Sequence, residues 1–164
     1  MRADGFARGE ACVAGAVRGE ASESDLSGLS GGAVRQDGRS ASLTAPNGQA
    51  QQALVRASLG EAGVACGALV GVEAHGTGTA LGDPIEVASL ASAVLRERGV
   101  ESEALPLGSV KANGGHAEPA AGVVGLLRVS QSLRSALAPP NAQLRVLNPH
   151  VSSALIDVGS CALA

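Results

Sequence analysis

Two short glycine-rich stretches of the sequence each carry a histidine. The first is residues 75–84, HGTGTALGDP, and the second is residues 111–116, KANGGH. An imidazole can polarise a carbonyl, hold an enolate oxygen or move a proton near neutral pH. Two such groups at neighbouring strand ends can face one substrate oxygen and stabilise the negative charge that develops on it. The residue types therefore indicate a candidate reaction centre at His75 and His116.

Simpler interpretations of these stretches stay open at this point. The glycines can serve only as loop residues, or they can form an anion-binding turn at a helix N-terminus. The GxxxxGK[ST] and GxGxxG patterns of nucleotide sites do not occur in the sequence, which argues against a nucleotide site. Lys111 would ordinarily be a surface lysine, but its place between an apolar stretch and His116 favours a role in the site. His150 is interpreted as a turn histidine with a structural role.

The elements that must position these stretches are predicted from apolar periodicity and from glycine and proline. Residues 69–74 and 105–110 predict buried strands, each of which leads into one histidine stretch. Residues 83–98 and 119–137 predict the helices that follow. Asp83 is the expected cap of the first helix, and Glu86 stands in a capping-box-like position. The candidate buried positions are Ile85, Leu90, Val94 and Leu95 in the first helix, and Val123, Leu126, Leu127, Val129 and Leu133 in the second.

The rest of the chain gives weaker signals. Residues 48–62 predict a helix that Gly63 ends, because glycine favours the left-handed conformation found there. Residues 11–17 and 155–158 predict further short strands, and 20–32 and 34–45 predict loops. Strands that alternate with helices indicate an α/β fold, in which sites lie at the carboxyl ends of the strands.

Composition narrows the class of protein. The chain has 164 residues, of which 45% are apolar and 16% charged, and Phe6 is the only aromatic residue. A core of small side chains then depends on close backbone approach or on neighbouring segments. The net charge of -3, with no basic stripe, argues against nucleic-acid binding. No apolar run is long enough to span a membrane, and residues 1–10 do not resemble a signal peptide. We expect a soluble, intracellular, cytoplasmic chain, with any organelle left open.

The three cysteines, Cys12, Cys66 and Cys161, stand far apart and form no CxxC pair. Their spacing predicts neither a zinc site nor a disulfide framework. We therefore expect no metal and no bound cofactor.

Five segments, in order along the chain, resemble motifs of the β-ketoacyl synthases (ketosynthases) of polyketide and fatty-acid synthesis. Residues 72–86, VEAHGTGTALGDPIE, resemble the first histidine motif, and residues 108–122, GSVKANGGHAEPAAG, resemble the second. Residues 4–10, DGFARGE, and 33–48, AVRQDGRSASLTAPNG, are similar to two upstream signatures. Residues 137–151 resemble the family's Pro-Pro stretch that ends in NPHV.

The resemblance implies a thiolase-like layered α/β/α/β/α fold, here incomplete. It implies an acyltransferase of the 3-oxoacyl-[acyl-carrier-protein] synthase type, which extends an acyl chain by decarboxylative Claisen condensation. The malonyl thioester is carried on the phosphopantetheine of an acyl carrier protein, and the acyl group is carried on a cysteine. The expected partners are therefore acyl carrier protein and malonyl and acyl thioesters. The complete domain would be a homodimer.

The resemblance also implies a role for each matching residue. His75 and His116 would bind the malonyl thioester carbonyl and stabilise the enolate. Lys111 would support His116 electrostatically and pair with Glu86. Thr77 and Thr79 would hydrogen-bond the phosphopantetheine arm, and Asp83 and Asn113 would hold the loops in shape.

The sequence departs from the family pattern in several places. None of the three cysteines stands in a TACSSS-like context, so we expect the nucleophile to lie outside this sequence, upstream of residue 4. The GFGGTNAH segment expected after residue 151 is missing, and about ten residues are missing between Glu10 and Ala33. Arg35 replaces the usual Asn. Gly114 replaces the usual Ile, and two glycines ahead of His116 would loosen its loop.

We divide the chain into residues 1–64, the end of an N-terminal half with a connecting loop and helix, and residues 65–164, which carry both histidine motifs. Three functions remain open: part of a condensing ketosynthase, a non-catalytic remnant or interaction module, and a decarboxylase that does not condense.

Overall fold

The computed structural model describes residues 7–20, 22, 27–40, 42, 45–99, 102–142, 144–156, 158 and 161–163. The first three residues of the 4–10 motif, which include Phe6, lie outside this part of the chain. Its longer helices are α1 (Gly48–Ala62), α2 (Gly82–Ala93), α4 (Ala121–Ser135) and α5 (Pro149–Leu155). Shorter elements are η1 (Cys66–Ala68), η2 (Leu95–Glu97), α3 (Lys111–Gly114) and η3 (Glu118–Ala120). The strands are β1 (Val72–Glu73), β2 (Leu105–Gly108) and β3 (Cys161–Leu163).

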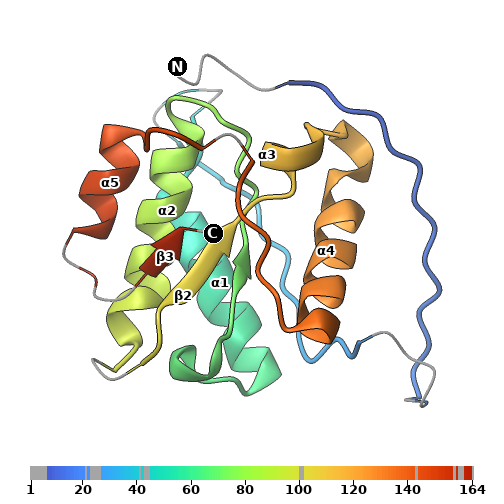
Figure 1. Cartoon of the computed structure of the whole chain (residues 1–164). Coiled ribbons are helices and arrows are strands. Elements are labelled where there is room, and N and C mark those ends of the chain that lie inside the picture. The colour runs from blue at the N-terminus through green and yellow to red at the C-terminus, as the bar shows by residue number, and fades with distance from the viewer. Residues whose placement is uncertain are drawn as a thin grey trace.

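The three strands form one parallel sheet in the order β1-β2-β3. Val72 of β1 is paired with Leu107 of β2, and Leu105 of β2 is paired with Cys161 of β3. Figure 1 shows α1, α2 and α5 grouped to one side of the sheet and α4 on the other. Parallel strands place their carboxyl ends at one edge of the sheet, so the segments that follow β1 and β2 meet there.

The core lies between the sheet and the helices α2 and α5. Leu105 and Leu107, which alternate along β2, are 1% and 4% exposed, and Val94 is 1% exposed. The buried members are Val87, Leu90, Ala91, Ala93, Val94, Leu95, Leu105, Leu107, Val151 and Val158. From α1, Val55 and Leu59 pack against this cluster, four residues apart on one helix face. The α/β alternation expected from the sequence is confirmed.

Several predicted boundaries are confirmed closely and others are wrong. The 48–62 helix is α1, and Gly63 ends it in the left-handed conformation, with φ 64° and ψ 25°. The predicted 83–98 helix breaks at Val94, whose φ of -128° and ψ of -58° separate α2 from η2. The predicted 119–137 helix is η3 followed by the shorter α4.

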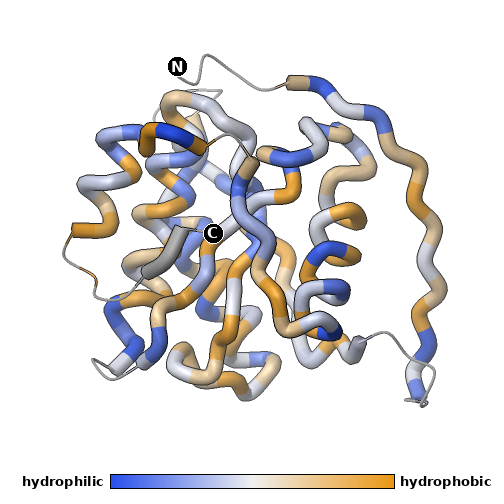
Figure 2. Tube along the Cα trace, viewed as in Figure 1, coloured by the Kyte–Doolittle hydropathy of each residue, from blue (hydrophilic) through white to orange (hydrophobic). Residues whose placement is uncertain are grey.

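The two weakest strand predictions are wrong. Residues 11–17 run as extended chain past α4 without joining the sheet, and this segment carries apolar residues (Figures 1 and 2). Residue 155 ends helix α5, and the third strand begins only at Cys161. An apolar run forms a strand only where a sheet edge is available to pair with it, and the periodicity of the sequence does not contain that information.

The predicted buried face of α4 is also corrected. Val123, Leu126, Leu127 and Leu133 are 43%, 56%, 39% and 56% exposed. The face that α4 turns inward carries the small residues Ala121, Gly125 and Ser130 instead. Gly125 allows α4 to approach Glu73 of β1 closely, and the larger apolar residues are partly or largely exposed to solvent.

No helix in the described ranges is both long and apolar enough to cross a membrane.

Candidate functional site

The first histidine stretch leaves the end of β1 and is held by a carboxylate from α2. The Ala74 N–H donates to the Gly108 carbonyl at 2.8 Å, which continues the pairing of β1 with β2. The two oxygens of Glu86 then accept the His75 and Gly76 N–H groups at 2.6 and 2.8 Å. Two hydrogen bonds to an ionised acceptor are strong, so Glu86 fixes the backbone that carries the imidazole.

Asp83 holds the far side of the same stretch. Its carboxylate accepts the Gly78 N–H at 3.1 Å and the Thr79 N–H at 3.3 Å. Burial raises the pKa of Asp83, while the hydrogen bonds from Gly78 and Thr79 act in the opposite direction. The expectation that Asp83 caps the helix is wrong, because α2 begins one residue earlier, with Leu81 at its N-cap. Asp83 instead binds the loop that precedes its own helix.

Thr77 and Thr79 lie on one side of this loop. The Thr79 hydroxyl oxygen accepts the Gly82 N–H at 3.0 Å. A Cβ added to Gly82 would clash with the Thr79 Oγ1 and lie 3.9 Å from the Thr77 Oγ1, so both hydroxyls face the same region of the loop.

The second histidine stretch leaves β2 through the single turn of α3. Gly115 follows in a backbone conformation with φ 77°, and His116 comes next. The His116 Nδ1 accepts the Glu118 N–H at 3.1 Å. In the neutral imidazole the proton is therefore on Nε2, because a ring nitrogen that accepts cannot also carry the proton. This arrangement makes Nε2 of His116 a hydrogen-bond donor.

A strap from the N-terminal part of the chain, Ala7–Gly9, holds His116 by its backbone. The His116 N–H donates to the Ala7 carbonyl at 2.8 Å, and the Gly9 N–H donates to the His116 carbonyl at 3.0 Å. Arg8 adds an ion pair to Glu118 at 3.1 Å. A Cβ on Gly9 would lie 2.5 Å from the Gly114 carbonyl oxygen, so the two backbones pass too close for a side chain. This strap was not predicted from the sequence, although two glycines in facing motifs are the signal that points to it.

The fold brings the two histidines together from residues 41 positions apart. Their ring centroids are 5.7 Å apart, and the rings are nearly perpendicular at 89°. Desolvation lowers the pKa of His75, and the Lys111 ammonium lowers it further. Glu86 and Asp83 raise that pKa, and His116 lowers it. His75 is therefore favoured in its neutral form near pH 7. The two imidazole rings thus lie close together, as the sequence predicted.

Asn113 connects α3 to the segment after α4. Its Nδ2 donates to the Pro140 carbonyl at 3.2 Å, and its Oδ1 accepts the Ala142 N–H at 2.6 Å. Asn141 in turn accepts the Ser109 N–H at 3.0 Å through its Oδ1. A paired donor and acceptor of this kind is consistent with the expected role of Asn113 in holding the loop.

One expected contact is not formed. Glu86 binds the backbone N–H groups of His75 and Gly76, and among the described residues no ion pair joins it to Lys111. Lys111 is the first residue of α3, and its charge acts on His75. Both Glu86 oxygens bind the backbone of the first histidine stretch instead.

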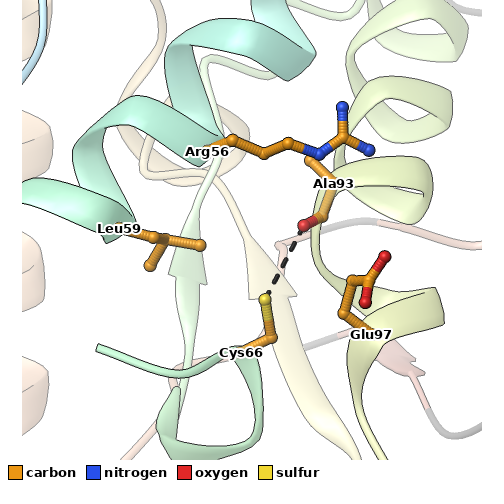
Figure 3. A pocket seen from close by; sticks show the side chains of 5 residues that line it. All are labelled: Arg56, Leu59, Cys66, Ala93 and Glu97. Carbon is orange, nitrogen blue, oxygen red and sulfur yellow. Dashed lines mark hydrogen bonds between the residues drawn. The ribbon is translucent and has the colours of Figure 1, made fainter. Parts of the chain in front are cut away.

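The cysteine side chains that the structure describes are those of Cys12 and Cys66. Cys12 is exposed, and Cys66 is half-buried beside an open cavity of about 480 Å³ (Figure 3). Its thiol contacts the Ala93 carbonyl at 3.7 Å. Arg56, Leu59 and Glu97 complete the lining, and neither histidine stretch contributes to it. The side chain of Cys161 lies outside the described residues.

Adjacent glycines 114 and 115 should respond oppositely to the same substitution. A Cβ on Gly114 meets nothing within 4 Å, so Gly114→Ala should raise the free energy of unfolding, by about 0.4–1 kcal/mol through the entropy of the unfolded chain. On Gly115 a Cβ would lie 3.1 Å from the Ala7 carbonyl oxygen. Gly115→Ala should cost about 1–3 kcal/mol because a residue with a side chain is strained at that φ. Urea melts of both variants measure the two changes, and equal signs would contradict the assigned geometry. Position 114 should therefore accept a side chain, whereas 115 requires glycine.

Comparison with known proteins gives one consistent result. The family model described as β-ketoacyl synthase, C-terminal domain, matches residues 26–145. Mycoketide-CoA synthase of Mycobacterium tuberculosis is 49% identical over 121 residues, which are 74% of this chain and 3% of that protein. An erythronolide synthase of Saccharopolyspora erythraea is 42% identical over 156 residues, which are 92% of this chain and 4% of that protein.

A solved structure agrees with these relatives. The oxazolomycin ketosynthase domain of Streptomyces albus JA3453 superposes with a TM-score of 0.75 at 36% identity, covering 84% of this chain and 23% of that chain. The expected thiolase-like α/β fold is confirmed, and the described part of the chain is a portion of it. This chain spans only a small share of each of these proteins.

Proposed function

Because this chain belongs to the β-ketoacyl synthase family, we propose that it forms the malonyl-binding side of a ketosynthase site in polyketide synthesis. The observation that carries this proposal is the pairing of His75 and His116 at the ends of β1 and β2, with ring centroids 5.7 Å apart. Two imidazoles so placed can donate N–H groups to one thioester oxygen. Donors fixed in advance stabilise a developing oxyanion more than water does, because they need not reorient during the reaction.

The proposed reaction uses this charge stabilisation in two steps. The bond between the malonyl α-carbon and its carboxylate breaks, carbon dioxide leaves, and the electron pair becomes an enolate whose oxygen is held by the two histidines. The enolate carbon then attacks the carbonyl of an acyl group on a cysteine. The new carbon–carbon bond forms as the cysteine thiolate leaves. We propose that a ketosynthase segment outside these 164 residues supplies that cysteine, which makes the complete enzyme an acyltransferase.

The other site residues have supporting roles in this proposal. Thr77 and Thr79, whose hydroxyls face the same region of the loop, would bind the phosphopantetheine arm of the acyl carrier protein. Lys111 keeps His75 neutral by lowering its pKa, after the larger effect of desolvation. Glu86, Asp83 and Asn113 hold the loops through the hydrogen bonds described above.

The apolar face of α4 formed by Val123, Leu126, Leu127 and Leu133 is exposed, which supports further ketosynthase segments as its neighbours. We propose that the completed domain is a homodimer.

A hybrid ketosynthase tests the proposal. In it, residues 7–156 of this chain replace the matching segment of the oxazolomycin ketosynthase domain, whose own upstream part is kept. Given an acyl thioester and malonyl carrier protein, the hybrid should release carbon dioxide and form the β-ketoacyl thioester, detected by mass spectrometry. A folded hybrid that binds the acyl group but forms neither product would show that this segment does not function as a ketosynthase.

A further inference from the structure

One buried carboxylate near the site belongs to neither histidine stretch. Glu73 is the last residue of β1, two positions before His75, and its side chain is only 8% exposed. Its partner Arg128 lies on α4 and is 14% exposed. A buried charge is costly unless it is paired and hydrogen-bonded. The contacts of Glu73 therefore have to satisfy both of its oxygens.

The two oxygens bind different elements. Oε1 accepts the N–H of Val110, the residue just before α3, at 2.6 Å. Oε2 accepts from Nη1 of Arg128 at 2.5 Å, and Nη2 of Arg128 donates to the Pro139 carbonyl at 2.9 Å. Glu73 thus links β1 to the start of α3 and, through Arg128, to α4 and the segment that follows α4.

The sequence leaves room for this side chain on α4. A Cβ on Gly125 would lie 3.4 Å from Cγ of Glu73 and 3.9 Å from its Oε1. Gly125 is buried and faces β1, so the absence of a side chain there lets the carboxylate reach Val110. Glu73 and Gly125 therefore fit each other across the interface of β1 with α4.

These contacts bear directly on the spacing of the two histidines. Val110 precedes Lys111 at the start of α3, and His116 lies just beyond the end of α3. His75 follows β1 by two residues. One side chain therefore connects the backbone that carries the first histidine to the backbone that carries Lys111 and the second.

We propose that Glu73 is a positioning residue, which holds the two histidine stretches in register by binding the Val110 N–H and the Arg128 guanidinium with its two carboxylate oxygens. The proposal deepens the ketosynthase function proposed above, and its meaning for catalysis rests on that function. Glu73 does not touch the reacting atoms in this arrangement. It acts through the placement of Lys111, His75 and His116.

The variant Glu73→Gln keeps the size of the side chain and replaces one of its two acceptor oxygens by an NH2 group. Both carboxylate oxygens face donors, so the amide NH2 of glutamine must face either the Val110 N–H or Arg128, and one of the two links is lost. The matched control is Glu103→Gln, the same change at an exposed glutamate.

The titration of His75 in the full chain, followed by its ring resonances in NMR spectra, provides the readout. The charged groups that act on its pKa are Lys111, Glu86, His116 and Asp83. Loss of the Glu73 carboxylate by itself would lower the pKa of His75 or leave it unchanged, because it removes a negative charge. Release of α3 would raise that pKa, because it moves Lys111 away and lets water in. The direction of the change therefore distinguishes the two effects.

We expect the pKa of His75 to rise in Glu73→Gln and to stay unchanged in Glu103→Gln. If Glu73→Gln does not fold, the apolar double variant Glu73→Leu with Arg128→Met decides, because replacing both members of a buried ion pair by apolar residues often preserves stability. It also lacks the Val110 link, so the pKa of His75 should again rise. An unchanged or lowered His75 pKa in the folded variant would overturn the proposal and leave Glu73 a purely structural residue.

The hybrid ketosynthase supplies an independent measurement. There Glu73→Gln should lower kcat for decarboxylation by about 100-fold, since a displacement of about 1 Å can have that effect, with a smaller change in KM for malonyl carrier protein. A rise in KM of about 100-fold with an unchanged kcat would contradict positioning of the histidines. If the unsubstituted hybrid is inactive, the proposed function fails, whereas the His75 titration still decides the role of Glu73.

Discussion

In the hybrid ketosynthase, His116→Ala should slow carbon dioxide release from malonyl carrier protein by about 100- to 1,000-fold, the usual effect of removing one oxyanion donor. The reason is geometric. Nδ1 of His116 accepts the Glu118 N–H, so the proton of the neutral ring is on Nε2, and the backbone is clamped by Ala7 and Gly9. Alanine keeps the backbone clamp and removes the donor. Release of labelled carbon dioxide at saturating substrate measures the change in kcat.

The control for this variant is another histidine of the same chain. His150 lies exposed in the first turn of α5, where its N–H donates to Oδ1 of Asn148 at 2.9 Å. His150→Ala should leave decarboxylation within about twofold of the unsubstituted hybrid, because exposed substitutions away from a site change little. Equal losses in both variants would mean that His116 matters only for folding. A full rate in His116→Ala would remove it from the oxyanion site.

The second large effect is on stability. Gly76→Ala should lower the free energy of unfolding of the chain by about 2–5 kcal/mol, from about 1–2 kcal/mol of left-handed strain and about 1–3 kcal/mol of overpacking. Gly76 has φ 47°, and a Cβ there would lie 2.6 Å from Cβ of Ser109. Ser109 is itself 6% exposed, so it has little room to move. Chemical denaturation followed by circular dichroism measures the loss.

A glycine in open surroundings provides the comparison for Gly76. Gly60 lies in the last turn of α1, and a Cβ there meets nothing within 4 Å. Gly60→Ala should therefore raise the free energy of unfolding by about 0.5–1 kcal/mol, because alanine has the higher helix propensity. If Gly76→Ala were as harmless as Gly60→Ala, the close approach of Gly76 to Ser109 would be wrong. Because the Gly76 N–H donates to Glu86, a backbone shift forced by the added Cβ should disturb the neighbouring His75 first.

The family and the order of most helices and strands could be predicted from the sequence alone. His75 and His116 stand in motifs long enough to identify the family, and the local pattern located α1, β2 and the start of α2 closely. These features are local: a helix needs apolar residues at helical spacing and a suitable end, as at Gly63, and both are written in neighbouring positions. The small residues of α4 were present in the sequence too, but nothing local marked them as its inward face.

Which groups meet in space could be learned only from the folded chain. It placed the imidazole rings 5.7 Å apart, exposed Leu126 and Leu133, and left residues 11–17 without a strand partner. In the structure Glu86 binds the backbone of the first histidine stretch instead of Lys111, and Glu73 links β1 to the start of α3. The physical reason is that burial and charge pairing depend on distances between residues far apart in the chain. A sequence pattern alone does not give those distances, because they are set only when the chain folds.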